Sequence, residues 1–267
     1  MNETEFNREF ESLRLRHEAL KEQVANQIEM YTHLVETEGP NIEAQYMMLV
    51  GQLECQVMQL DMEVRRWKRR FELRQMYLNC GEKPDPVAIE AQLDKEFEDW
   101  QKKIGEFVAK LEGSKLQYDA VKMSDADTNA VRCEYLKAVK KLHPDLNKNL
   151  SEAAVNLWHQ IQKAYAAKSW RQLKFLVSLV DEVVAGTADF SATPDGLAEL
   201  REACAQLEAK GREVAGQIAA LKATVPFTYA VLLEDPLLLE RKQNSLNKKI
   251  RALKAAIEKY ERTWNNG

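Results

Sequence analysis

The chain contains little glycine and proline, with 10 and 7 in 267 residues. These two residues most often end helices and shape turns, so their scarcity excludes a collagen-like or loop-rich architecture. The chain also lacks any long stretch in which apolar and polar residues alternate, the period-two pattern of a strand. Since charged and helix-favouring residues are abundant, the composition predicts an all-α fold built from long helices.

Cysteine is also scarce. The four cysteines are far apart and form no CxxC pair: Cys55, Cys80, Cys133 and Cys204. This spacing excludes a zinc ribbon and disfavours a disulfide framework, and it predicts reduced thiols in a cytoplasmic protein. No run reaches the roughly 18 apolar residues that a membrane span requires, and the opening MNETEFNREFES has no apolar segment of a signal peptide. We therefore expect no membrane partner.

Neither sign of charge dominates, since the net charge is −4 and the pI is about 5.8. That balance disfavours nucleic acid as a partner. The four histidines form no HExxH, and GxxxxGK[ST], GxGxxG and GxSxG are all missing. The sequence therefore predicts no enzyme: no catalytic residue, no metal ligand and no cofactor.

What the chain does contain is apolar residues spaced by three and four, the pattern of a coiled-coil seam. One seam runs from Phe6 to Leu34 and another from Ile42 to Phe71, with Glu38-Gly39-Pro40-Asn41 between them. Gly and Pro predict a turn there. A short turn returns the chain antiparallel, so that position i faces about position 79−i. We expect a coiled-coil hairpin over residues 1–80.

A basic run, RRWKRRFELR, occupies residues 65–74. Such a run is typical of nucleic-acid binding. The hairpin register, however, places its cations beside the acidic residues of the first helix, Glu3, Glu5, Glu9 and Glu11. Ion pairing along the seam is therefore the favoured interpretation, with nucleic-acid binding as the alternative.

Two further segments complete the helical framework. Residues 81–125 carry a connecting amphipathic helix, and residues 191–267 repeat the hairpin pattern around an apolar loop at 224–236. Asp235 and Pro236 predict the N-cap and first turn of the last helix. The apolar loop either folds back on a neighbouring helix or forms a partner-binding tip.

The middle segment, residues 126–190, contains KKLHPDLNKNLSEAA, in which His143-Pro144-Asp145 separates two helices. Pro144 disfavours the α conformation for His143, so the first of these helices must end by Leu142. Residues 131–150 hold five cations against Glu134 and Asp145; the cations are Arg132, Lys137, Lys140, Lys141 and Lys148. A locally basic surface predicts an acidic protein surface as its partner.

Residues 127–176 resemble the J domain of DnaJ-type co-chaperones. The resemblance is carried by the His-Pro-Asp turn, the basic helix before it, Asn147 after it, and Trp158, Ile161, Ala164 and Tyr165 in the following helix. It implies an antiparallel helical hairpin that stimulates a DnaK-type chaperone ATPase. The implied partner-binding residues are His143, Pro144, Asp145, Arg132, Lys137, Lys140 and Lys141. The family's Tyr-Tyr-x-x-Leu-Gly start and its Gly-rich and zinc-binding regions are absent.

Two functions follow as hypotheses. In the first, the chain is a co-chaperone or adaptor that recruits a DnaK-type ATPase through the His-Pro-Asp turn, while its coiled coils contact client proteins or form a homo-oligomer. In the second, it is a coiled-coil scaffold or protein-interaction protein whose J-like segment no longer recruits a chaperone.

Overall fold

A computed structural model describes residues 3–119, 124–184 and 190–265. The fold is all-α as expected, and the described residues include no strand. The chain forms two units, each assembled from separate segments. Unit 1 comprises Met1–Pro40 and Val121–Phe227, and unit 2 comprises Asn41–Ala120 and Thr228–Gly267. Within the described ranges, every helix is too short or too polar to cross a membrane.

The expected turn at residues 38–41 is wrong. Helical residues continue through α1 (Glu3–His33), η1 (Leu34–Glu38), α2 (Gly39–Tyr46), η2 (Met47–Gly51) and α3 (Gln52–Asn79). Pro40 has no N–H, and its ring clashes with the preceding turn of an α-helix. The chain accommodates it by widening that turn into the π-helix η1, in which the N–H of Gly39 donates to the carbonyl of Leu34.

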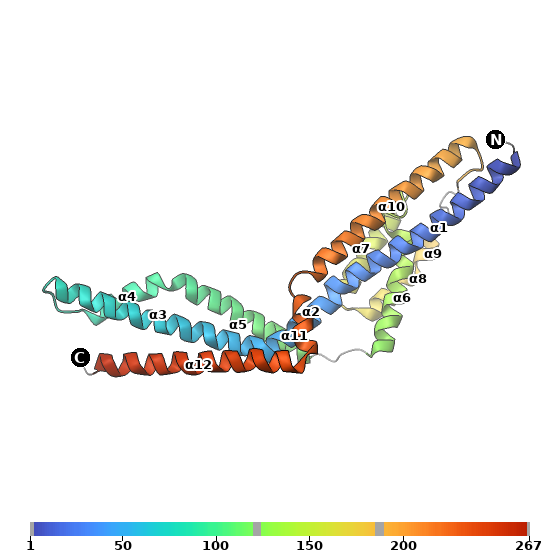
Figure 1. The fold of residues 1–267 in the computed structure, drawn as a ribbon. Coiled ribbons are helices and arrows are strands. Elements are labelled where there is room, and N and C mark those ends of the chain that lie inside the picture. The colour runs from blue at the N-terminus through green and yellow to red at the C-terminus, as the bar shows by residue number, and fades with distance from the viewer. Residues whose placement is uncertain (1–2, 120–123, 185–189, 266–267) are drawn as a thin grey trace. The chain divides into compact units, whose positions relative to one another are not determined.

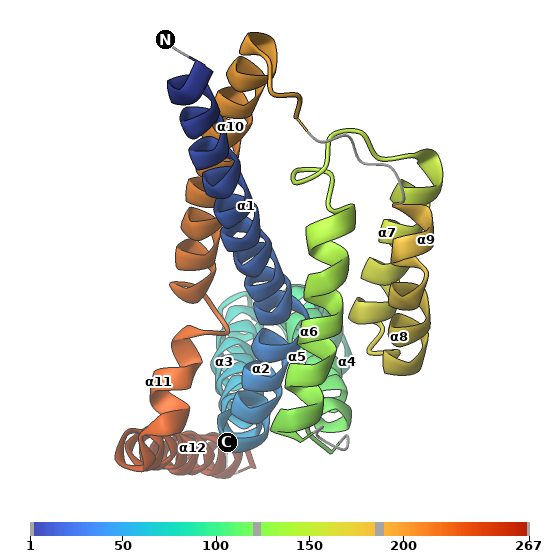
Figure 2. The ribbon, with the colours of Figure 1, turned by 90° about the vertical axis from the view of Figure 1, so that its right-hand side faces the viewer.

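Unit 1 is built on α1 and the helices that flank it (Figure 2). These are α6 (Asp125–Leu142), α7 (Glu152–Ala166), α8 (Trp170–Ser178), α9 (Val180–Val183) and α10 (Pro194–Lys222). One apolar cluster joins α1, α6 to α9 and α10, with Tyr135, Leu142, Ile161 and Leu173 among its fully buried members. The helices of the J-like segment are thus part of a core that residues outside the segment complete.

Unit 2 holds α3, α4 (Pro86–Glu96), α5 (Glu98–Asp119), α11 (Thr228–Glu234) and α12 (Pro236–Asn265) (Figure 1). The connecting segment therefore contains two helices rather than one. Three cations of residues 65–74, Arg66, Arg69 and Arg70, bond acidic residues of α4 rather than of residues 3–11, and Arg65 bonds Asp61 of its own helix. Arg66 bonds Glu90 and Asp94, and Arg69 bonds Glu96. Helical residues run on from α2 through η2 into α3, and the basic end of α3 bonds α4.

Both expected antiparallel hairpins are replaced by parallel pairs. Helix α10 runs parallel to α1, as shown by the ion pairs Glu9–Arg201 and Arg16–Glu208. Helix α12 runs parallel to α3, since Gln243 bonds the carbonyl of Leu49 and Tyr260 contacts Phe71. The segments 1–80 and 191–267 are consequently each divided between the two units.

The apolar loop at 224–236 largely folds back, the first of its two expected alternatives. Phe227 is buried, and the ring of Tyr229 stacks on Tyr46 with centroids 3.7 Å apart. Asp235 caps α12 as expected, because its carboxylate accepts from the N–H of Leu237 at 2.9 Å. Val231 remains exposed.

Candidate functional site: the His-Pro-Asp turn

The turn lies between two helices whose ends follow from local chemistry. Helix α6 ends at Leu142, and His143 adopts an extended conformation with φ −68° and ψ 127°, as the following proline requires. Helix α7 starts after Ser151, whose hydroxyl accepts from the N–H of Ala154. His143 contacts Trp158 and Tyr135 contacts Tyr165, so α7 returns along α6. The predicted core residues of both helices are buried.

His143 is turned toward the hairpin. Its ring meets Trp158 edge-on with centroids 5.3 Å apart, and only 17% of its side chain is exposed. The backbone N–H of Asp145 donates to Nδ1 of His143 at 3.2 Å, a hydrogen bond that requires Nδ1 to carry no proton. Burial lowers the pKa of His143, and the charge of Lys210 lowers it further against the opposing carboxylate of Asp145.

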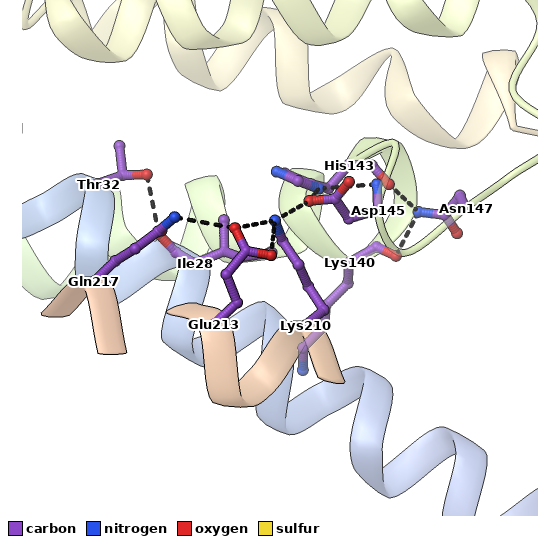
Figure 3. Close-up of polar contacts among 9 residues, drawn as sticks. All are labelled: Ile28, Thr32, Lys140, His143, Asp145, Asn147, Lys210, Glu213 and Gln217. Atoms are coloured by element: carbon purple, nitrogen blue, oxygen red, sulfur yellow. Dashed lines mark hydrogen bonds and ion pairs between the residues drawn. The ribbon is translucent and has the colours of Figure 1, made fainter. Parts of the chain in front are cut away.

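Asp145 is 42% exposed at its side chain and is held by a lysine from α10. Figure 3 shows Lys210 reaching toward the turn, where its Nζ lies 2.9 Å from the carboxylate of Asp145 and 3.1 Å from that of Glu213. The hydrogen bond to Asp145 is the main cause that raises the pKa of Lys210. The carboxylate that a chaperone would have to bind is thus already paired within unit 1.

Asn147 bonds the turn to the end of α6 and to α1. Its side-chain amide donates to the carbonyls of Lys140 and His143 at 3.2 Å each (Figure 3). In a continuing helix the carbonyl of Lys140 would accept from the N–H of residue 144, and Pro144 has no N–H to donate. Its side-chain oxygen accepts from Lys21 of α1 at 2.8 Å. Both α1 and α10 therefore contact the turn.

Each predicted basic residue of α6 also has an acidic partner in the chain. Arg132 bonds Glu29 of α1 through two hydrogen bonds of 2.7 and 2.9 Å, and Glu29 is buried. The other pairs are Lys140–Glu22 with α1, Lys141–Asp181 with α9, and Lys137–Glu134 within α6. Each of these four cations is thus bonded to a carboxylate of the same chain.

Of the predicted site residues, the structure brings His143, Pro144 and Asp145 together in the turn, with Lys140 and Lys141 in the last turn of α6, whereas Arg132 and Lys137 lie farther back along that helix. Their charged side chains are bonded to other residues of the same chain. Sequence reasoning missed Lys21 and Lys210, which hold the turn from helices more than sixty residues away. The excess of positive charge in residues 131–150 pointed to an acidic partner. It contained no signal for cations arriving from α1 and α10.

Within the described ranges, no three histidine, cysteine or acidic side chains are grouped so that they could bind a metal ion. Comparison with known proteins adds no relative: no family model, no curated protein and no solved structure matches this chain. The resemblance to a J domain therefore stays a prediction that rests on residues 127–176.

Proposed function

We propose that the chain is a helical scaffold, a protein-interaction protein in which the J-like hairpin is a structural part of unit 1. One observation carries the proposal: the charges that chaperone recruitment would use are bonded to other helices of the same unit. Asp145 is bonded to Lys210 of α10, and Arg132 and Lys140 are bonded to Glu29 and Glu22 of α1. A docking chaperone would have to displace these partners.

The position of His143 supports the same conclusion. An imidazole that binds a partner has to project from the turn, whereas this ring lies against Trp158 and accepts a backbone hydrogen bond. A ring in that position stabilises the turn and the end of α6. The His-Pro-Asp sequence then serves the packing of α6, α7 and α10.

The test is single-turnover ATP hydrolysis by the DnaK-type chaperone of the same organism, with and without the full chain. We expect the basal rate with both the wild type and His143→Gln, while that organism's own DnaJ-type protein stimulates in parallel. His143→Gln should lower the melting temperature more than Lys137→Gln, because Lys137 is bonded only within its own helix. Stimulation by the wild type that His143→Gln abolishes would refute the proposal.

A second candidate is recruitment of the ATPase, favoured by the exposure of Pro144 and Asp145. Ion pairs at a protein surface contribute about 0–1 kcal/mol, so an arginine of a partner is able to displace Lys210. Under this candidate, Lys210→Ala stimulates ATP hydrolysis above the wild-type level, and adding Asp145→Asn removes the gain. Under the scaffold proposal neither variant stimulates.

A further inference from the structure

Helix α12 carries a concentration of positive charge that the net charge of −4 conceals. Between Glu240 and Glu258 it has no acidic residue and six cations: Arg241, Lys242, Lys248, Lys249, Arg251 and Lys254. Residues 65–74 carry a comparable run, but Arg66, Arg69 and Arg70 of that run bond acidic residues of α4, and Arg65 bonds Asp61. The two runs therefore differ in how far their charge is neutralised.

The cations of α12 lie mainly on its outer side. The row that faces α3 is apolar, with Ile250 and Ile257 buried. Arg241, Lys248 and Arg251 follow one another by seven and three residues, which places them on the opposite side of the helix. All three are exposed, and so are Lys249 and Lys254 at the flanks. Figure 1 shows α12 lying along α3 with its other side uncovered by elements of unit 2.

Most of these cations have no acidic partner among the residues that the structure describes. Counting only residues that the structure describes, Lys242 alone of the six is ion-paired, to Glu54 at 2.8 Å. An unpaired basic row on a straight helix is complementary to an extended anionic surface. Bilayers with acidic lipids and nucleic acids are two surfaces of that kind.

Exposed apolar residues distinguish between these two surfaces. Leu237 is 64% exposed and stands four residues before Arg241 on the same side of α12; Val231, on the preceding α11, is 67% exposed. A bilayer accepts such side chains below its headgroups, whereas a nucleic-acid backbone has no place for them. The aromatic residues Tyr260 and Trp264, which stack on bases in many nucleic-acid sites, contact Phe71 of α3 instead.

We propose that the outer face of α12 docks on a bilayer that contains anionic lipids. This proposal replaces the expectation of no membrane partner, which was based on the lack of a membrane-spanning run and does not bear on docking at the surface. The exposed cations lie at the headgroups, and Leu237 inserts between them. Because α3 covers the apolar row, the helix binds without rolling that row into the lipid. Binding is therefore mainly electrostatic and weakens as salt concentration rises. This inference is independent of the scaffold proposal, since it uses other residues in the other unit.

Cosedimentation of the full chain with vesicles tests it. We expect binding to mixed phosphatidylcholine–phosphatidylserine vesicles and none to pure phosphatidylcholine. Lys248→Gln with Arg251→Gln should weaken binding about 30-fold, at about fivefold for each charge removed. The control is Lys102→Gln with Lys103→Gln, exposed residues of α5 in the same unit that change the net charge equally. It should bind like the wild type, and circular dichroism should show both variants folded.

A third variant separates a bilayer from other polyanions. Leu237→Gln should weaken vesicle binding, because it removes the inserted side chain and leaves every charge in place. Equal losses from the α12 and α5 charge variants would overturn the proposal, as would no preference for anionic vesicles. Binding to duplex DNA that depends on Lys248 and Arg251, without vesicle binding, would overturn it in favour of a nucleic-acid surface.

Discussion

Arg132 and Glu29 form an ion pair between α6 and α1 of the same chain. The guanidinium donates two hydrogen bonds to a buried carboxylate, and this bonding is the main cause that raises the pKa of Arg132. A burial that would otherwise be unfavourable for Glu29 is thereby compensated. A basic residue in a sequence predicts an acidic neighbour, but it does not indicate which molecule provides that neighbour.

Two partly buried histidines of unit 1, His33 and His143, predict that acid destabilises this unit. Burial lowers the pKa of both His33 and His143 from 6.5, and the nearby cations Arg132 and Lys210 lower it further. The unfolded chain therefore takes up protons first as the pH falls. The stability contributed by the neutral rings is complete above about pH 6.5 and is lost as the pH falls toward the lower folded pKa values. The melting temperature should drop between pH 7.5 and pH 5.

Single substitutions show which histidine causes the drop in melting temperature between pH 7.5 and pH 5. His33→Gln and His143→Gln should each reduce the difference in melting temperature between the two pH values. His159→Gln, at an exposed position of α7, should leave the difference unchanged. If all three variants retain the wild-type difference, the acid sensitivity comes from other groups.

A residue that disfavours helix ends a helix only where tertiary contacts do not stabilise its continuation. Pro144 ends α6 and Asp85 starts α4 as local capping chemistry predicts, since these bonds involve residues only a few positions apart. Gly39 and Pro40 looked equally disruptive, yet helix continues through them. A π-helical turn absorbs Pro40, and buried Leu34 and Phe227 lie beside this stretch. Whether the helix ends at Gly39 and Pro40 thus depends on tertiary packing, which the local sequence does not show.

The start of α10 provides a stability test at the level of a single helix. The hydroxyl of Thr193 accepts from the N–H of Gly196, and a Cβ on Gly196 would lie 2.0 Å from the carbonyl oxygen of Ser191. Gly196→Ala therefore forces the backbone to move and should destabilise the chain by about 1–3 kcal/mol. Chemical denaturation measures the change.

Gly216 on the same helix is the matched control, because a Cβ there meets nothing within 4 Å. Gly216→Ala should stabilise by about 0.5–1 kcal/mol, since alanine favours helix more than glycine does. Similar effects of the two substitutions would show that helix propensity, and not the contact with Ser191, governs this position.

The arrangement of the whole chain depends on which seams pair and in which direction. The three–four spacing of apolar residues correctly placed Phe10 and Leu200 on buried faces. A seam of this kind is compatible with a parallel or an antiparallel partner. Chain proximity favoured the antiparallel neighbour, whereas the structure pairs α1 with α10 and α3 with α12, far apart in sequence.

Crosslinking distinguishes the two pairings. Cysteines at positions 9 and 201, in a background without the natural cysteines, should be joined by a short bismaleimide reagent, because Glu9 and Arg201 form an ion pair between parallel helices. Cysteines at positions 9 and 70, which the antiparallel hairpin would place together, should not be joined. The structure instead bonds Arg70 to Glu90. Efficient crosslinking of position 9 to position 70 would instead support the antiparallel hairpin.

Helix content, the faces that become buried and the chain reversal at His143-Pro144-Asp145 all follow from the sequence. Each depends on residues within one or two turns of one another, where propensity, capping and steric exclusion act directly. The tertiary structure decided which apolar seams pair and which acidic residues the basic side chains bond. Ion pairs and apolar contacts form between whichever complementary surfaces the folded chain brings together, and Lys210 reaches Asp145 only after α10 packs beside α1.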